Sequence, residues 1–281
     1  MNLFNEFRNL IWLYRNRLEF QAEQNCRDFQ NFLSNVKSYY DINYRNLRIL
    51  EIGCGQRYPH ALILAQDNEV HAIDLNVIIY SWAPLRITRM FTKDGIIRGT
   101  KTVVRKALFD KKYHEKLAEC AGKRLTKMPE FHTMNAEDLD FLDSTFDFVF
   151  SVAVFEHIRN VETAVTELRR VLKPSGIFAI EINPFTGITG GHNLYGKDET
   201  TTEVPPWDHI RQNLYPATTY LNKLRLGDYR DIFSSYFDDV HFIENESNQY
   251  KKYLTNEIRE ELSDYSEHEL LTLGMGIIGK K

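Results

Sequence analysis

The sequence is poor in cysteine and has no long apolar run. Its three cysteines, Cys26, Cys54 and Cys120, are an odd number without C-x-x-C spacing, which argues against a disulfide framework and a structural zinc site. No basic stretch followed by an apolar core opens the chain, and no apolar run approaches the ~20 residues that span a bilayer. We therefore expect a soluble, cytoplasmic protein.

Glycine and proline are absent from Met1 to Tyr40. Apolar residues recur there at steps of three and four, from Leu3 to Val36, which indicates one helical face. We expect one long helix or two shorter ones, forming a helical cap over residues 1–45. The cap would pack on the core, although a homodimer formed through the same helices would need the same apolar stripe.

The stretch Leu47 to Asn76 predicts a βαβ unit. Its first apolar run ends in Glu51-Ile52-Gly53-Cys54-Gly55, where glycines allow the positive φ and close approach of a sharp turn. A helix is expected over residues 58–66 and a second strand over residues 69–73. This strand ends at Asp74, 19 residues after Gly55, where a carboxylate can accept both hydroxyl protons of a ribose that lies across the first turn.

The third glycine of the dinucleotide-binding fingerprint is missing. Gln56-Arg57-Tyr58-Pro59 stands in its place, and Pro59 lacks an N–H that a pyrophosphate would need. Glu51 would also repel a pyrophosphate, whereas it suits a ligand with an ammonium group. NAD and a dehydrogenase activity are therefore disfavoured. The stretch resembles motif I and the acidic end of strand two in class I S-adenosylmethionine-dependent methyltransferases, of the type 11-like kind.

Two later stretches match the same family in order. The apolar run Phe146 to His157 suits a central strand buried on both faces and matches the family signature F-D-x-V-x-S-x-x-V-x-x-H, in which the histidine is more often structural. The run Glu167 to Glu181, ELRRVLKPSGIFAIE, departs only at Ser175, where glycine is usual. The resemblance implies S-adenosylmethionine as cofactor, with its methionine end near Ser151 and its adenine near the turn after strand three. The implied cofactor-binding residues are Glu51, Gly53, Cys54, Gly55, Asp74, Leu75, Ala136, Glu137, Asp138 and Ser151.

The resemblance also implies a fold. We expect one Rossmann-like α/β domain over residues 1–281, with seven strands in the order 3-2-1-4-5-7-6 and only strand seven antiparallel. Towards the carboxyl end we expect a helix over residues 220–236, a strand over 240–243, a helix over 255–264 and a strand over 271–278.

A basic helical insertion is expected over residues 77–128, because a standard helical step between strands needs only ~20 to 25 residues. Its middle, Ile96 to Cys120, favours a helix. From Arg86 to Lys127 the chain has 13 Lys or Arg against four acids, or +9, so the net charge of −4 leaves −13 for the rest. Such a region can attract a phosphate, an acidic carrier, an anionic membrane surface or a nucleic acid, or can be a solvated helical face.

The irregular stretch Asn183 to Asn213 would lie at the carboxyl end of the sheet, where substrates bind. It contains His192, Tyr195, Asp208 and His209, which could serve chemistry or tie down a long loop. A neutral imidazole can take a hydroxyl proton, so His192 or His209 is the expected base, with Asp208 orienting it or binding a metal. Convergence on a metal cannot be read from sequence, so no metal site is assigned.

Together these features predict an S-adenosylmethionine-dependent methyltransferase that O-methylates a small-molecule or glycan-type acceptor. The alternatives are an RNA methyltransferase that uses the basic insertion, although the acidic remainder makes nucleic acid the weaker choice, and a catalytically silent methyltransferase-like binding protein.

Overall fold

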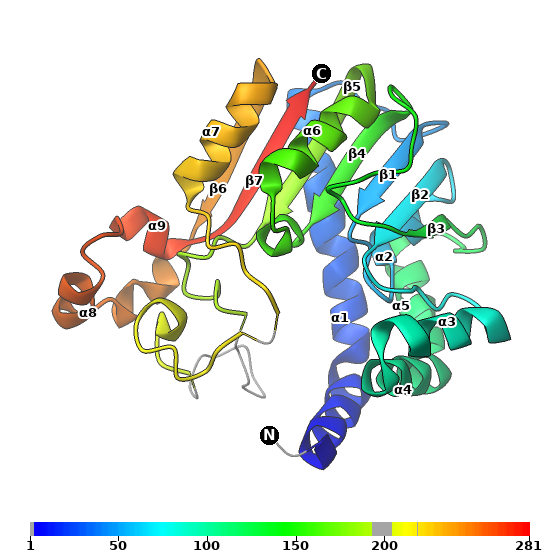
Figure 1. Ribbon diagram of the computed structural model, residues 1–281, viewed down its shortest axis with the longest axis horizontal. Helices are drawn as coiled ribbons and strands as arrows, with labels where there is room; N and C mark the ends of the chain where they lie inside the picture. The colour runs from blue at the N-terminus through cyan, green and yellow to red at the C-terminus, as the bar shows by residue number, and fades with distance from the viewer. Residues whose placement is uncertain (1–2, 193–203, 218) are drawn as a thin grey trace. The chain divides into compact units, whose positions relative to one another are not determined.

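The computed structural model describes residues 3–192, 204–217 and 219–281, with side chains from residue 15 on; Tyr195 lies outside the described residues. The strands form one seven-stranded sheet in the order β3-β2-β1-β4-β5-β7-β6 (Figure 1). β1 pairs in parallel with β2 and β2 with β3, whereas β7 is antiparallel to both β5 and β6. The predicted order and the antiparallel seventh strand are confirmed. The strands are β1 (Arg48–Ile52), β2 (Glu69–Asp74), β3 (Glu130–Thr133), β4 (Phe146–Val152), β5 (Leu172–Ile182), β6 (Asp239–Glu246) and β7 (Thr272–Lys280).

The chain forms two compact units that share β4, and each is described by itself. The first comprises residues 1–135 and 146–148. In β1, Ile49, Leu50 and Ile52 are all buried, as a parallel strand covered on both faces requires. Helix α1 (Leu3–Tyr39) is a single long helix, and its apolar stripe, which includes Ala22 and Phe29, is buried within this unit, where α1 packs against α5 and α2 (Pro59–Leu64).

The insertion folds as α3 (Pro84–Asp94), α4 (Ile96–Arg105), a π-helical turn (Lys106–Asp110) and α5 (Lys111–Ala121). The stretch predicted to be helical over Ile96 to Cys120 is therefore helical throughout, although it contains one turn of wider winding. α3 and α4 pack on each other, and Met90 is buried with Val77 and Ile79 beneath them. The insertion is thus an ordered part of the first unit (Figure 1).

The second unit comprises residues 136–145 and 149–281. Its helices are α6 (Val161–Val171), α7 (Leu226–Tyr236), α8 (Asn256–Glu261) and α9 (Glu267–Leu271), with 3-10 turns at Phe155–His157, Asp208–Ile210 and Asn248–Tyr253. A separate core surrounds Trp207, which is fully buried and donates its indole N–H to the Leu270 carbonyl at 3.1 Å. In the part of the chain that the structure describes, no helix combines the length and apolar character needed to cross a membrane.

Two helix predictions in this unit were wrong at their ends. The helix expected over residues 220–236 begins only at Leu226. The Asn222 side chain donates to the carbonyls of Phe155 and Ile158, at 2.7 and 3.1 Å, and this holds the preceding segment in a non-helical conformation. The helix expected over residues 255–264 is α8 alone, because the chain turns after Leu262 and Ser266 caps a new helix, α9.

Candidate active site

The glycine turn between β1 and α2 is built as the sequence predicts. Gly53 and Gly55 have φ of 78° and 64°, which glycine adopts without strain. The amides of Gly53 and Cys54 both donate to the Ile73 carbonyl, at 2.9 and 3.0 Å. No atom lies within 4 Å of the place that a Cβ on Gly55 would take. The turn is therefore fixed by backbone hydrogen bonds and is open to the close approach of a ligand.

Asp74 stands at the end of β2, directly beside this turn. Its Oδ2 accepts from the Gly55 amide at 3.1 Å, and its Oδ1 accepts from the backbone and side-chain amides of Asn76 at 2.8 and 3.0 Å. The carboxylate thus links the glycine turn to the end of β2, and a ribose would lie across these two segments. Leu75 follows with 61% of its surface exposed.

Glu51 has a role inside the chain that the sequence did not reveal. Its side chain is 1% exposed, and its carboxylate accepts from the Ala61 amide at 2.9 Å and contacts His60 Nδ1 at 3.1 Å. Ala61 is in the first turn of α2, so Glu51 satisfies an amide that has no partner within the helix. The negative charge still lies behind the turn, and direct contact with a ligand's ammonium group stays a prediction.

The insertion packs against the segment that follows the glycine turn. Arg105 and Asp110 form a buried ion pair at 2.9 Å, and Arg105 also donates to the Gln56 carbonyl at 3.1 Å. His114 Nε2 lies 3.1 Å from the Arg57 carbonyl. These residues were missed from sequence. Arg105 and Asp110 are five residues apart, which is the spacing of the hydrogen bonds in a π-helix. This spacing was the signal that could have indicated them.

In the second unit, the predicted adenine-side residues have different environments. Ala136 is buried and Asp138 is exposed, whereas Glu137 Oε1 accepts from the amides of Arg159 and Asn160, both at 3.2 Å. Glu137 therefore fixes a local turn, and its role beside the adenine stays a prediction. Ser151 is fully buried at the end of β4.

Asp208 and His209 are bonded to backbone groups. Asp208 is 1% exposed, and its two oxygens accept from the amides of Leu214 and Tyr215 at 3.0 and 2.9 Å. His209 Nε2 is 2.7 Å from the Phe185 carbonyl, which can only accept, so this nitrogen carries the proton. Burial lowers the pKa of His209. Both side chains tie down the loop, and a catalytic role for either stays a prediction.

His192 lies in a different group, with Glu156 and His157. Its Nε2 is 3.8 Å from Glu156 Oε1, and its ring centroid is 4.8 Å from that of His157. Glu156 is 2% exposed, and burial raises its pKa. Glu156 was missed from the sequence, although the adjacent Glu-His pair directly after the strand signature was a signal for it.

A family model described as a methyltransferase domain matches residues 102–180, from α4 to β5. The strand order of the sheet is the one that the resemblance to class I S-adenosylmethionine-dependent methyltransferases implied.

Solved structures similar to this chain were also found, whereas no curated protein matches it. A S-adenosylmethionine-dependent methyltransferase from Methanosarcina mazei is 19% identical with a TM-score of 0.48, covering 88% of this chain and 96% of that one. Phosphoethanolamine N-methyltransferase 2 of Haemonchus contortus, in complex with S-adenosylmethionine, is 18% identical with a TM-score of 0.48, covering 90% of this chain and 52% of that one. The [4+2]-cyclase SpnF is 15% identical with a TM-score of 0.45, covering 88% and 78%. Similarities of this size carry no argument about the acceptor.

The residues of the first unit fit S-adenosylmethionine as the cofactor. A carboxylate has about four lone-pair positions, and the chain's own amides use three of those on Asp74. One lone-pair position on Oδ2 remains for a hydrogen bond from a ribose hydroxyl. The hydrogen bond from the Asn76 side chain can be replaced by one from a second ribose hydroxyl. Cys54 is buried, and burial, followed by the charges of Glu51 and Asp74, raises the pKa of its thiol, so it stays protonated.

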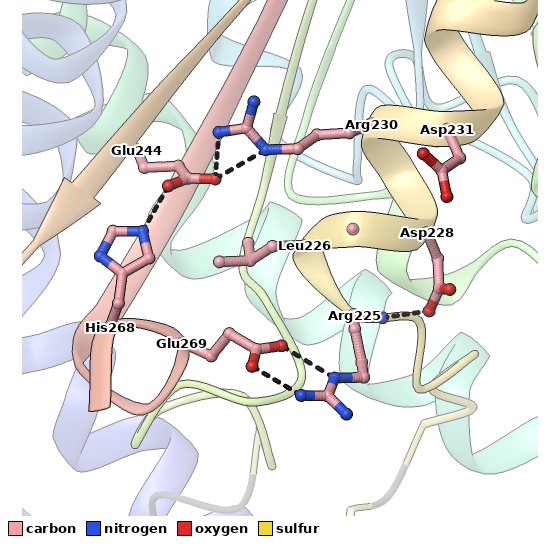
Figure 2. A pocket seen from close by; sticks show the side chains of 9 residues that line it. Arg225, Leu226, Asp228, Arg230, Asp231, Glu244, His268 and Glu269 are labelled. Atoms are coloured by element: carbon pink, nitrogen blue, oxygen red, sulfur yellow. Dashed lines mark hydrogen bonds and ion pairs between the residues drawn. The ribbon is translucent and has the colours of Figure 1, made fainter. Parts of the chain in front are cut away.

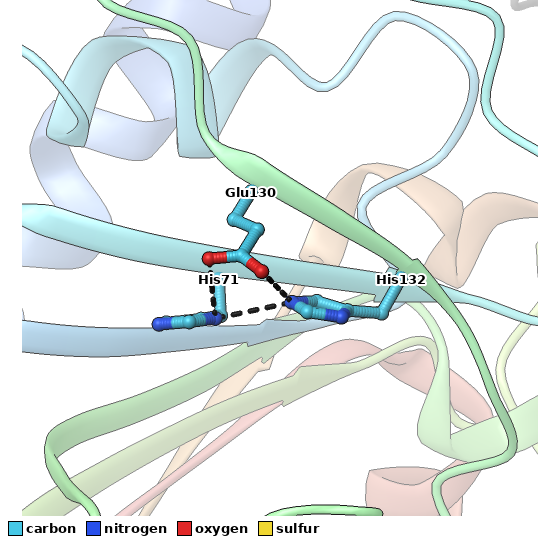
Figure 3. A group of neighbouring side chains, drawn as sticks. All are labelled: His71, Glu130 and His132. Atoms are coloured by element: carbon cyan, nitrogen blue, oxygen red, sulfur yellow. Dashed lines mark hydrogen bonds and ion pairs between the residues drawn. The ribbon is translucent and has the colours of Figure 1, made fainter.

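A second pair of histidines lies on β2 and β3. His71 Nδ1 is 3.1 Å from His132 Nε2, and Glu130 reaches both rings at 3.6 Å (Figure 3). The other nitrogen of His71 is 3.1 Å from Glu69. Both nitrogens of His71 therefore have partners within the sheet.

A surface pocket of the second unit lies where α7, β6 and α9 meet (Figure 2). Arg225 pairs with Glu269 at 2.6 Å, and Arg230 pairs with Glu244 at 2.7 Å. His268 reaches Glu244 at 2.5 Å. These charges are matched within the pocket, which therefore has the character of a structural ion-pair network.

Proposed function

We propose that this protein methylates a hydroxyl oxygen of a small-molecule or glycan-type acceptor. His192 carries the proposal, because its Nε2 is buried and has no hydrogen-bond partner among the described residues. Burial, followed by the charges of His157 and His209, lowers the pKa of His192 to about 4. The ring is therefore neutral at pH 7 and holds a lone pair beside the carboxyl ends of β4 and β5. An alcohol, unlike most amines, needs such a group because it must lose its proton.

Bound S-adenosylmethionine supplies an electrophilic methyl group on its sulfonium sulfur. As the methyl group moves, the bond from carbon to sulfur breaks with its electrons staying on sulfur, a bond from carbon to the acceptor oxygen forms, and the hydroxyl proton passes to the neutral ring of His192. In this proposal the first unit holds the cofactor through Gly53, Gly55 and Asp74, and His192 activates the acceptor. The remaining work is alignment of the two reactants and exclusion of water.

The charge pattern of the insertion supports a small acceptor over RNA. Several of its lysines form ion pairs with acids of the same unit, as in Lys112 with Glu19 at 2.6 Å and Lys116 with Glu23 at 2.9 Å. Lys123 likewise pairs with Asp67. These pairs reduce the charge available to phosphates. An RNA methyltransferase is the alternative, and a silent binding protein is the third candidate.

The helical cap bears on the proposed homodimer. Between Leu18 and Val36 the apolar stripe of α1 is buried within its own unit. A second subunit is therefore not needed to cover this part of the stripe, and the homodimer stays a proposal, as does the cytoplasmic location.

The test is to identify the acceptor and then to compare two histidine variants. The protein is incubated with S-adenosylmethionine that carries a deuterated methyl group and with fractions of polar metabolites, oligosaccharides or RNA, and the fraction that gains the labelled methyl is analysed. We expect a methyl ether. His192→Ala should lower kcat ~100-fold or more without a change in cofactor affinity.

His209→Ala is the matched control, because His209 lies in the same loop but bonds a carbonyl. It should lower thermal stability more than kcat. Labelled N-methyl product would overturn the oxygen assignment, and labelled RNA would favour the alternative. Cofactor binding without transfer to any fraction would favour the silent binding protein.

A further inference from the structure

The three side chains around His192 have the composition of a metal site. Glu156, His157 and His192 each offer one ligand atom, and these atoms lie within 4.8 Å of one another. Around a tetrahedral Zn²⁺ with bonds of about 2.1 Å, the ligand atoms are about 3.4 Å apart. The three side chains would therefore have to close by up to about 1.4 Å to coordinate an ion. We propose that Glu156, His157 and His192 bind a divalent first-row transition cation such as Zn²⁺.

The buried oxygen of Glu156 is the second observation that points to a ligand. Glu156 Oε1 accepts from the backbone and side-chain amides of Asn183, at 3.3 and 3.0 Å. Its Oε2 is buried and has no hydrogen-bond partner among the described residues, and the same holds for His192 Nε2. A chain rarely leaves such buried atoms unsatisfied, because each loses its hydration on folding. A cation bound by Glu156 and His192 would satisfy them.

His157 is oriented as a metal ligand would be. Its Nδ1 lies 2.8 Å from the Tyr220 carbonyl, so this nitrogen carries the proton and Nε2 keeps the lone pair. Ligand histidines in proteins commonly make this outer hydrogen bond to a carbonyl, which fixes both the tautomer and the ring direction. The Asn222 side chain bonds the carbonyls on either side of this turn and fixes its backbone.

The backbone at His192 is held in an uncommon conformation. Its φ is 48°, which a non-glycine residue adopts only when its surroundings impose it. The preceding Gly190 and Gly191 have no room for a Cβ, because the Pro184 carbonyl and the His209 ring lie 2.3 and 2.7 Å from the place it would take.

The ligand set selects the kind of cation. Two imidazoles and one carboxylate are borderline ligands that suit zinc, iron and cobalt, whereas magnesium and calcium prefer oxygen ligands alone.

For its chemical role, the site rests on the proposed function. A cation beside the acceptor hydroxyl would polarise it and lower its pKa. The proton then passes to water as the oxygen takes the methyl group from sulfur. In this account His192 activates the acceptor by holding the cation rather than by removing the proton itself.

The experiment measures metal binding without any methyl transfer. The full chain is stripped with a chelator and titrated with Co²⁺, whose visible absorption reports coordination by nitrogen, and with Zn²⁺ by calorimetry. One ion per chain is expected. Glu156→Gln and His192→Gln should each weaken binding about 100-fold or more. His132→Gln, in the other histidine pair, should leave it unchanged.

Variants are compared only where S-adenosylmethionine affinity and thermal unfolding show that they fold. No Co²⁺ absorption in the wild type, or loss of binding in His132→Gln but not in His192→Gln, would overturn the site. Full methyl transfer by stripped protein that binds no cation would remove the metal site and keep the proposed function. Cation binding at these residues without an O-methyl product would keep the metal site and remove the proposed function.

Discussion

Asp74 is the residue on which cofactor affinity should depend most. Replacement by alanine removes the charged acceptor for the ribose hydroxyls and the bond to the Gly55 amide. Losing one hydrogen bond to a charged group costs about 1.5–3 kcal/mol, so we expect Asp74→Ala to weaken S-adenosylmethionine binding ~10- to 150-fold in calorimetry.

Asp94→Ala is the matched control for this prediction. Asp94 also accepts a backbone hydrogen bond, from the Val77 amide at 3.0 Å, but this bond does not involve the glycine turn. It should keep the affinity within about threefold. Wild-type affinity in Asp74→Ala would remove Asp74 from the cofactor site.

At this scale the sequence predicts residues whose role depends on local spacing. Gly55 and Asp74 were found because the βαβ pattern fixes where they meet. Glu156 and Arg105 were not, since their partners, Asn183 and Gln56, are 27 and 49 residues away and no periodicity links them. Asp208 and His209 were correctly placed in a loop, but their hydrogen-bond partners are backbone groups, which the sequence does not distinguish.

Among the elements, α6 contacts the turn before β4 through several hydrogen bonds, and Arg170 makes the largest share of those from side chains. Arg170 donates to the carbonyls of Leu139 and Phe141, both at 2.7 Å, and pairs with Glu167 and Asp143, both at 2.8 Å. Arg170→Met would leave two carbonyls without their donor. We expect a loss of about 2–3 kcal/mol in the free energy of unfolding, measured by urea titration.

The neighbouring Arg169 provides the control. It makes a single exposed hydrogen bond, to the Tyr236 carbonyl at 3.0 Å. Arg169→Met should cost less than about 1 kcal/mol. Equal losses in the two variants would show that the Arg170 network adds nothing beyond a surface contact.

The contact between α9 and β6 should respond to pH. Hydrogen bonds to Glu244 and Glu246 raise the pKa of His268 above its ordinary 6.5. For a raised pKa, the stabilisation is fully present below the unfolded value and is lost as pH rises through the folded value. We therefore expect the melting temperature to fall as pH increases from about 6.5 to 8, and His268→Gln to reduce this fall.

His241→Gln tests whether the effect belongs to His268. His241 is also on β6 and pairs with Asp239 at 3.2 Å. Because His268 stays in place, this variant should keep the wild-type slope. An unchanged slope in His268→Gln would contradict the assignment.

At the scale of the whole molecule, the strand order was predicted through resemblance and not through propensity. Three motifs in order identified the fold, and the sheet follows from it. The helix expected to begin at residue 220 fails because Asn222 bonds two distant carbonyls, which overrides local preference. The arrangement of the basic insertion was also beyond prediction, because it depends on buried contacts such as Arg105 with Gln56.

The net charge of the whole chain leads to the last prediction. The insertion carries +9 against −13 elsewhere, but Lys112, Lys116 and Lys123 are paired with acids of the first unit. A protein that neutralises Z phosphates loses affinity for single-stranded RNA with a slope of about −0.7Z in log salt. With three of its lysines paired in this way, about six of the nine net positive charges remain, so we expect at most about six phosphate contacts, a slope no steeper than about −4 and weak binding at 0.15 M salt. Filter binding of a 20-nucleotide RNA between 0.05 and 0.3 M salt measures it. The double variant Glu19→Gln, Asp67→Asn removes the acids paired with Lys112 and Lys123 and should steepen the slope, which shows that the assay detects added charge. A wild-type slope of about −5 or steeper would mean that the insertion binds a phosphate backbone, and RNA would then replace the small acceptor as the leading substrate class.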